Sequence, residues 1–288
     1  MKPYLVLINP YARQGKKLVY HALEKLQSLE VELVSIFPKD LTSIPDLIRD
    51  YKNQVDAVII GGGDGTLNLA VEALVETKLP LGILPLGTAN DLAKTLDIPI
   101  SLNTACEIIA KGKQRLIDLG WVNGKYFFNV ASLGLSVDIT ENLTKQSKKR
   151  WGILAYAITA LKVLLNTRTF QADLIINGEC IQVKTIQIAV GNGRYYGGGM
   201  TIAYDATIDD QRLDIYSLEI EHWYQILALF PALRKGLYLQ KPGIRSFSGE
   251  EMVIYTKKPY PINTDGEITA YTPAHFRVIP QALSVFVP

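Results

Sequence analysis

The sequence predicts an α/β fold in two parts, an N-terminal doubly wound domain followed by a C-terminal β-sandwich-like domain. Two observations lead to this prediction. Over the first 100 residues, apolar strand-like runs alternate with helix-like segments in β-α-β-α order. From about residue 116 onward, strand-like runs follow one another and helix-like segments become rare. A length of 288 residues and a hydrophobic content of 48% leave enough apolar material for two cores.

The first half is expected to form a parallel sheet with helices between its strands. Strand-like runs occupy residues 4–8, 31–37, 55–60 and 81–84, and helix-like segments occupy residues 16–28, 44–52 and 89–96. Ser43 stands three residues before Asp46 in an approximate capping box, and Pro45 falls in the first helical turn. The run 55–60 is continuously apolar, as in a parallel strand buried on both faces. We therefore predict a Rossmann-like domain over residues 1–120, with its ligand loops at the carboxyl ends of the strands.

The second half is expected to be largely β. Strand-like runs occupy residues 125–130, 170–176, 181–190 and 213–218. Asn123-Gly124 and Asn177-Gly178 each separate two runs, and Asn-Gly at such a place is the strongest short hairpin signal. Helix-like patterns interrupt the strands at 151–165 and 223–239. No repeat or Gly/Ser linker is visible, so a sandwich-like domain over residues 121–288 should adjoin the first domain tightly.

Composition argues against several classes of protein. Thirty Lys and Arg stand against 28 Asp and Glu, and a net charge of +2 gives no general reason to expect nucleic-acid binding. The longest apolar stretch, 151–165, is shorter than the roughly 18 to 20 residues that span a bilayer, and the run 4–8 is too short for a signal-peptide core. The protein is therefore expected to be cytoplasmic. Cys106 and Cys180 lack C-x-x-C spacing and are interpreted as two buried thiols.

The strongest functional signal is the segment Gly61-Gly62-Gly63-Asp64-Gly65-Thr66-Leu67-Asn68, between a buried strand and the start of a helix. Glycines let the backbone approach a ligand, and consecutive N–H groups then form an anion-binding nest. The N-terminus of the following helix adds partial positive charge. Because Asp64 alone would repel a phosphate, its presence indicates a cation such as Mg²⁺ between the two. An ordinary strand-to-helix turn does not require this run of residues.

Two familiar nucleotide-binding motifs are absent from the sequence. No G-x-x-x-x-G-K-[ST] segment occurs, and Gly61-x-Gly63 is followed by Thr66 where a dinucleotide fingerprint has glycine. The segment 62–66 instead resembles the signature that diacylglycerol, sphingosine and NAD kinases share, with a related form in phosphofructokinases. Pro85-Leu86-Gly87-Thr88-Ala89-Asn90-Asp91 is similar to the P-x-G-T-x-N-D segment of the lipid-kinase branch.

Further motifs resemble the bacterial diacylglycerol kinases of the YegS type, and they follow in order along the chain. They are Asn9-Pro10 with Gly15, Gly191-Asn192-Gly193 through Gly197-Gly198-Gly199, Ala206 to Asp210, and Thr264-Asp265-Gly266-Glu267. The similarity thus extends from residue 9 to residue 267. It implies an ATP-dependent lipid kinase, with diacylglycerol as the expected substrate.

The resemblance also implies roles for individual residues. Glu267 would be the general base for the lipid hydroxyl, while Asp64 and Asp91 would organise Mg²⁺ and water around the phosphates. ATP contacts are implied at Asn9, Pro10, Tyr11, Ala12 and Arg13, at Gly62, Gly63, Asp64, Gly65, Thr66, Leu67 and Asn68, and at Thr88. A second, structural Mg²⁺ is implied at Thr207, Asp210 and Arg212, the first and last through their carbonyl groups.

The sequence departs from the family pattern at two positions. The glycine usual after the second aspartate is Gln211, and the acidic residue usual after Asn68 is Leu69. Without the resemblance, Asp265-Gly266 reads as an ordinary hairpin turn with an exposed Glu267 beside it. The departures at Leu69 and Gln211 leave open a second function, that of a nucleotide-binding regulator without catalysis. Retention of Asp64, Asp91 and Glu267 together argues against it. Other acceptors also stay open, namely phosphatidylglycerol, a sphingoid base or ceramide, and more remotely NAD.

Two segments are candidates for contact with a membrane surface. Lys145, Lys148, Lys149 and Arg150 precede the apolar stretch 151–165, and the segment 223–241 combines aromatic and basic residues around Pro231. Both are equally typical of helices that cover a sheet. The expectation is a cytoplasmic enzyme with peripheral membrane contact. Its expected partners are ATP and a lipid at the membrane surface, without nucleic acid, and a homodimer is left open.

Overall fold

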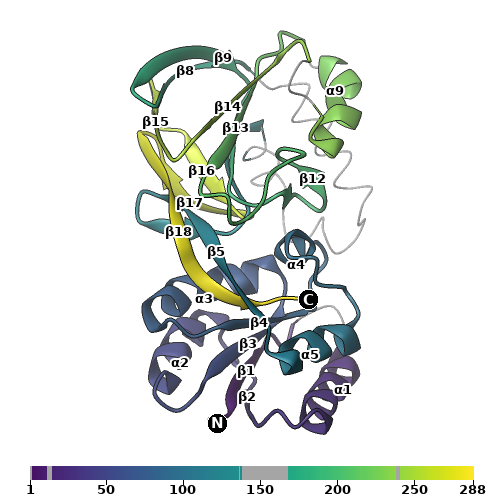
Figure 1. The fold of residues 1–288 in the computed structure, drawn as a ribbon. Helices are drawn as coiled ribbons and strands as arrows, with labels where there is room; N and C mark the ends of the chain where they lie inside the picture. The colour runs from purple at the N-terminus through teal and green to yellow at the C-terminus, as the bar shows by residue number, and fades with distance from the viewer. Residues whose placement is uncertain (1, 12–14, 136, 138–167, 223, 238–240) are drawn as a thin grey trace.

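The computed structural model describes the chain apart from residues 1, 12–14, 136, 138–167, 223 and 238–240 (Figure 1). In the N-terminal half, four parallel strands lie in the order β2-β1-β3-β4 at one side of a ten-stranded sheet. They are β1 (Tyr4–Ile8), β2 (Leu33–Ile36), β3 (Ala57–Gly62) and β4 (Leu81–Pro85). Every residue of β1, β3 and β4 is buried, which explains their continuously apolar sequences.

Helices cover both faces of these parallel strands (Figure 1). They are α1 (Gly15–Ser28), α2 (Ile44–Tyr51), α3 (Asp64–Thr77), α4 (Asp91–Thr95) and α5 (Leu102–Lys111), with a 3₁₀ turn η1 (Leu41–Ser43) before α2. α1 contacts α5, and α2 contacts α3. The predicted doubly wound arrangement is confirmed.

The predicted capping box at Ser43 is wrong. The Ser43 side chain makes no cap hydrogen bond to α2, and its hydroxyl donates instead to the carbonyl of Asp40 at 2.7 Å. Asp40 takes the capping role one turn earlier, where its carboxylate accepts the N–H of Thr42 at 2.9 Å. The 3₁₀ turn thus receives the cap, and Pro45 enters α2 where no N–H donor is needed.

The C-terminal half packs two sheets face to face. A six-stranded sheet has the order β14-β13-β10-β7-β16-β17, and it faces the part of the ten-stranded sheet formed by β18-β15-β8-β9 with β5 and β6. The strands are β5 (Gln114–Val122), β6 (Lys125–Phe127), β7 (Val130–Gly134), β8 (Phe170–Ile176), β9 (Glu179–Thr185), β10 (Gln187–Gly191), β13 (Leu213–Leu218), β14 (Ile244–Gly249), β15 (Glu251–Thr256), β16 (Pro261–Thr264), β17 (Glu267–Tyr271) and β18 (Ala274–Phe286). β11 (Tyr195–Tyr196) and β12 (Met200–Thr201) form a small separate ribbon, and α9 (Tyr224–Lys235) contacts β12. The predicted sandwich-like domain is confirmed.

Both Asn-Gly hairpins are present where the sequence predicts them. Asn123 and Gly124 join β5 to β6, Asn177 and Gly178 join β8 to β9, and all four have positive φ, as a two-residue turn of this kind requires. The predicted run 181–190 is divided between the two sheets, β9 in one and β10 in the other. Where the chain passes from one sheet to the other, the buried Thr185 hydroxyl is hydrogen-bonded to the backbone of Gln187 and to the carbonyl of Leu218. These bonds satisfy backbone groups that would otherwise be buried without a partner.

The last strand, β18, belongs to both halves. Its first residues pair with β15 of the sandwich, residues 276–279 and 283–286 pair with β5, and Val285 near its end pairs with β4 of the parallel sheet. Phe276 is buried in the sandwich core, whereas Phe286 is buried in the N-terminal core. Figure 1 shows this long yellow strand running from the upper to the lower part of the molecule. The division at residue 120 lies within β5 and stays a prediction.

The remaining expectations about the fold concern the two cysteines, the predicted helix at 223–239 and the two segments between residues 145 and 165. Cys106 is buried, but Cys180 is exposed on the edge strand β9, so its assignment as a buried thiol is wrong. The predicted helix at 223–239 corresponds to α9, which contains Pro231. The segments 145–150 and 151–165 lie outside the described residues. Within the described residues, no helix is long and apolar enough to cross a membrane.

Candidate active site

The candidate site begins where two loops meet at the carboxyl edge of the parallel strands. The Leu86 N–H donates to the Gly62 carbonyl at 2.9 Å, so the loop after β4 lies against the loop after β3. A Cβ placed on Gly87 would be only 2.5 Å from Gly63 Cα. No side chain fits between the two backbones, and glycine is therefore required for this approach. The two loops carry the predicted residues Asp64 and Asp91 at the starts of α3 and α4.

Asp64 and Asp91 hold the two helix starts together. The Leu92 N–H of α4 donates to Asp64 Oδ1 at 3.1 Å. Burial raises the pKa of Asp64, the neighbouring Asp91 carboxylate raises it further, and the Leu92 N–H opposes both effects. The carboxylates are therefore close enough to repel each other when both are charged.

Asp91 also connects the two halves of the chain. Its side chain is 7% exposed, and its Oδ2 accepts the Gly198 N–H of the second half at 2.8 Å. Its Oδ1 lies 3.2 Å from Lys94 Nζ, one helical turn away. A buried carboxylate needs such partners, and here they come from both sides of the domain junction.

The β16–β17 hairpin brings two more carboxylates to the same place. The turn residues Asp265 and Gly266 have positive φ, and Thr264 pairs with Glu267 across the turn, so the backbone is that of an ordinary hairpin, and Glu267 is exposed beside it. The Asp265 carboxylate accepts three backbone N–H groups, those of Phe128, Asn129 and Val130, at 2.7 to 3.1 Å. These bonds anchor the turn to the connection between β6 and β7.

Glu267 extends from this anchored turn toward the glycine-rich loop. A Cβ placed on Gly65 would lie 3.9 Å from Glu267 Oε1, which puts the Glu267 side chain beside the first turn of α3. Burial raises the pKa of Asp265 to about 6, its three N–H donors oppose that rise, and the charge of Asp64 adds to it. The structure thus brings Asp64, Asp91 and Glu267 together, with Asp265 among them.

The first nucleotide loop lies next to the glycine-rich loop. Asn9 Nδ2 donates to Thr66 Oγ1 at 3.1 Å, and Asn9 Oδ1 accepts the Tyr11 N–H at 2.8 Å. Pro10 lies between Asn9 and Tyr11, and the other two predicted residues of this loop, Ala12 and Arg13, lie outside the described residues. The predicted contact residue Thr88 is exposed in the loop after β4. Leu67 is buried in the N-terminal core, so only its backbone is available to a ligand. In the described part of the chain, the buried Asn68 Oδ1 has no hydrogen-bond partner.

Asp64 and Asp91, the two carboxylates predicted to organise Mg²⁺, differ in how well they fit a metal ion. Both oxygens of Asp91 already face donors, Lys94 Nζ and the Gly198 N–H, so its arrangement does not fit direct ligation. Asp64 Oδ1 accepts the Leu92 N–H, and the Asp64 carboxylate also accepts the backbone N–H of Asp91. Among the described residues, no group of three or more His, Cys, Asp or Glu is arranged to hold a metal. Asp64 differs from Asp91 in having no ion pair with a described residue, and its contact with Mg²⁺ stays a prediction.

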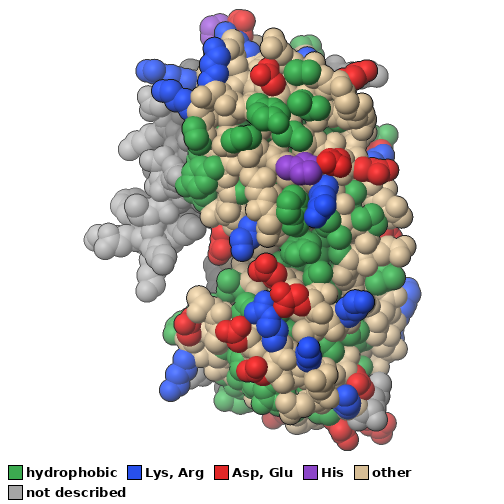
Figure 2. Space-filling model, turned by 90° about the vertical axis from the view of Figure 1, so that its left-hand side faces the viewer, with side chains coloured by type: hydrophobic (Ala, Val, Ile, Leu, Met, Phe, Trp, Pro, Cys, Tyr) green, Lys and Arg blue, Asp and Glu red, His purple; other side chains and the backbone are tan. Residues whose placement is uncertain are grey.

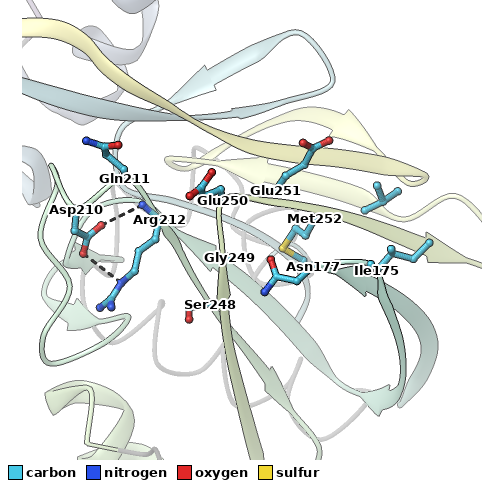
Figure 3. Close-up of a pocket in the computed structure, with 12 residues that line it drawn as sticks. Ile175, Asn177, Asp210, Gln211, Arg212, Ser248, Gly249, Glu250, Glu251 and Met252 are labelled. Carbon is cyan, nitrogen blue, oxygen red and sulfur yellow. Dashed lines mark hydrogen bonds and ion pairs between the residues drawn. The ribbon is translucent and has the colours of Figure 1, made fainter.

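The second predicted metal site lies elsewhere, in one turn before β13. The Asp210 carboxylate accepts the N–H groups of Thr207 and Arg212 at 3.2 and 3.3 Å, and the Arg212 side chain lies 3.3 Å from Asp210 Oδ2 (Figure 3). Gln211 has a left-handed backbone conformation (φ 59°), which is the conformation that favours the glycine usual at this position in the family. The Gln211 N–H donates to the buried Asp118 carboxylate at 2.7 Å. The turn's geometry therefore survives Gln211, and the metal role of the three residues stays a prediction.

A groove of about 890 Å³ adjoins this turn and is separate from the carboxylate cluster of Asp64, Asp91, Asp265 and Glu267. It is lined by Asp210, Gln211 and Arg212, by the β8–β9 turn and by the β14–β15 turn (Figure 3). Neither Asp64, Asp91 nor Glu267 lines it.

Sequence reasoning missed two residues of the carboxylate cluster. Lys94 carries the ammonium that contacts Asp91, and Asp265 was treated only as a turn residue. A signal for Lys94 was available, because it follows Asp91, the last residue of the P-x-G-T-x-N-D segment, at helical spacing. No sequence signal shows that the Asp265 side chain reaches the distant N–H groups of residues 128–130.

The site combines a glycine-rich turn with carboxylates from both halves of the chain. On an α/β domain joined to a β-sandwich-like domain, this combination is typical of a kinase that phosphorylates an alcohol group. Residues 3–122 match the diacylglycerol kinase catalytic domain, and residues 129–287 match the YegS C-terminal NAD kinase beta sandwich-like domain. The chain belongs to the diacylglycerol kinase family of lipid kinases.

Individual relatives agree with this assignment. The chain is 30% identical over 295 residues to a diacylglycerol kinase of Mycobacterium tuberculosis, covering 98% of this chain and 94% of that protein. It is 31% identical over 241 residues to a candidate lipid kinase of Staphylococcus epidermidis, covering 82% and 78%. A crystal structure of a candidate diacylglycerol kinase from Bacillus anthracis superposes with a TM-score of 0.85 at 25% identity, covering all of this chain and 95% of that one.

Proposed function

We propose that the protein transfers the γ-phosphate of ATP to a lipid hydroxyl group, with diacylglycerol as the first candidate acceptor. The observation that carries this proposal is the position of Glu267, 3.9 Å from a Cβ on Gly65 and thus beside the start of α3. A helix N-terminus with a glycine-rich turn is suited to phosphate groups. A carboxylate held beside it, from the other half of the chain, is suited to remove a proton from an acceptor.

In the proposed reaction, the acceptor oxygen forms a bond to the γ-phosphorus while the bond from that phosphorus to the β,γ-bridging oxygen breaks. Glu267 takes the hydroxyl proton, and ADP leaves. The backbone N–H groups from Gly62 to Gly65 and the N-terminus of α3 hold phosphate oxygens, and Asp265 fixes the turn that carries Glu267. Mg²⁺, held through Asp64, would supply charge neutralisation at the phosphates.

The reactive groups come from both halves of the chain, so the proposed reaction takes place at the domain junction. Excluding water there would limit hydrolysis of ATP. The lipid would be presented at a membrane surface, which makes peripheral membrane contact part of the proposal.

A screen for transfer of labelled phosphate from ATP tests the proposal. Diacylglycerol, phosphatidylglycerol, ceramide, sphingosine and NAD are offered separately, the lipids in mixed micelles, with and without Mg²⁺. We expect label on diacylglycerol and dependence on Mg²⁺. Label on another acceptor would correct the substrate, and ATP binding without transfer to any of them would favour a nucleotide-binding regulator.

Asp64→Asn is the decisive variant, because it removes a negative charge at the proposed phosphate site while preserving the shape of the side chain. We expect transfer to be nearly abolished and the fold to persist. Asp97→Asn is the matched control, since Asp97 is exposed just after α4 and already has the positive φ that asparagine tolerates. Full transfer by a folded Asp64→Asn protein would contradict the proposed mechanism.

A further inference from the structure

Lys94 is the cation that contacts the carboxylate cluster, and the proposed mechanism above gives it no role. It lies on α4, one turn after Asp91, with its Nζ 3.2 Å from Asp91 Oδ1. Asp64, Asp265 and Glu267 lie in the same region. A phosphate brought to four carboxylates meets strong repulsion unless a positive charge is present.

The position of Lys94 is set from both halves of the chain. A Cβ placed on Gly199 would be 3.8 Å from Lys94 Nζ, so the ammonium lies at the glycine turn 197–199. The adjacent Gly198 N–H donates to the other oxygen of Asp91 at 2.8 Å. Asp91 therefore bridges Lys94 and this turn, and the ammonium stays at the domain junction when the two halves are in contact.

The exposure of the pair suits contact with an incoming anion. The Asp91 side chain is 7% exposed, whereas the Lys94 side chain is 32% exposed. The ammonium has three N–H donors, and Asp91 accepts one of them. It can therefore contact a phosphate oxygen while it keeps its ion pair.

We propose that Lys94 contacts the phosphoryl group that is transferred, and that Asp91 acts as the positioning residue which holds Lys94 in place. This inference rests on the proposed function and adds a residue to it. The Lys94 ammonium stabilises negative charge on the oxygens of the phosphoryl group as the acceptor bond forms and the bond to ADP breaks. The substitution Lys94→Arg would keep a positive charge at this position, whereas Lys94→Met would keep a side chain of similar length without the charge.

The test compares Lys94→Met and Lys94→Arg with Lys25→Met. Lys25 is a matched control, because its side chain is 30% exposed and its Nζ lies 3.2 Å from Glu107, in an ion pair between α1 and α5 that includes none of the four carboxylates. Each variant is measured in single-turnover transfer from ATP, in separate titrations with ATP and ADP, and in thermal unfolding. Lys94→Met should lower the transfer rate about 10²- to 10³-fold, as loss of one preorganised donor does elsewhere, and Lys94→Arg should recover most of it.

The nucleotide titrations separate this role from a structural one and from the proposed function itself. Lys94→Met should weaken ATP binding while ADP binding stays unchanged, because only ATP carries the γ-phosphate. If the wild type transfers phosphate to no lipid, the proposed function fails, yet a lowered ratio of ATP to ADP affinity still supports the Lys94 contact. Equal effects on ATP and ADP, together with a transfer rate like that of wild type or Lys25→Met, would overturn the assignment.

Discussion

The contact between Gly63 and Gly87 makes Gly87→Ala a sharp test of how the two loops are held. The new Cβ would be 2.5 Å from Gly63 Cα and 2.7 Å from Asn90 Oδ1. Carbon atoms pack at about 3.5 to 4.0 Å, so the loops must separate by about 1 Å. The obstacle is backbone, which cannot rotate away. Overpacking of this kind costs about 1 to 3 kcal/mol of unfolding free energy.

The same separation moves Asp64 and Asp91 apart, since each follows one of the two loops. A misplacement of about 1 Å can lower catalysis about 10²-fold, so we expect that loss in labelled-phosphate transfer together with the loss of stability in denaturant unfolding. Gly112→Ala is the control, because Gly112 has a φ of +72° at the end of α5 and no neighbour within 4 Å of a new Cβ. It should cost about 1 to 2 kcal/mol through backbone strain alone and leave transfer unchanged. Wild-type transfer by Gly87→Ala would refute the reasoning.

Three further predictions concern single side chains. Glu267→Gln should lower single-turnover transfer by about 10²- to 10⁴-fold while ATP binding persists, and weakened ATP binding with unchanged transfer would reassign Glu267 to nucleotide positioning. Burial raises the pKa of Cys106 from 9.0 to about 11, so its contribution to stability is full below pH 9 and is lost as the pH rises to about 11. The stability advantage of wild type over Cys106→Ala should therefore shrink by roughly 2 to 3 kcal/mol across that range in denaturant unfolding, and a constant advantage would contradict it. Gln211→Gly should raise the free energy of unfolding by up to about 1 kcal/mol. Glycine removes the steric strain of a positive φ at this position, and its greater chain entropy in the unfolded state offsets part of that gain. A lowered melting temperature would contradict this prediction.

The parallel half of the fold was predictable because local chemistry and burial agree there. Continuous apolar runs mark β1, β3 and β4, and the glycine-rich loop marks the turn into α3. The two Asn-Gly hairpins were predictable for a similar reason, since positive φ at both positions restricts the residues that fit. Where one local rule decides the backbone, the sequence alone is sufficient.

Long-range pairing limits what the sequence can reveal about the rest. The run 181–190 reads as one strand, and its division between two sheets depends on where β13 and β7 lie. The roles of Lys94 and Asp265 depend on contacts with residues more than 100 positions away, Gly198 through Asp91 and the N–H groups of 128–130. Spacing along the chain contains no record of such contacts.

The path of β18 bears on how this protein is made. Residues 274–286 leave the ribosome long after residues 4–85, yet Val285 and Phe286 complete the core and the sheet that residues 4–85 begin. The N-terminal half must therefore wait, incomplete, until β18 has been made. A chain that terminates early, even one that contains every residue up to Glu267, lacks the strand that joins β4 to β15 and presents an unpaired sheet edge to the cell's proteases. Folding of the N-terminal half is thus tied to synthesis of a strand that lies far along the chain.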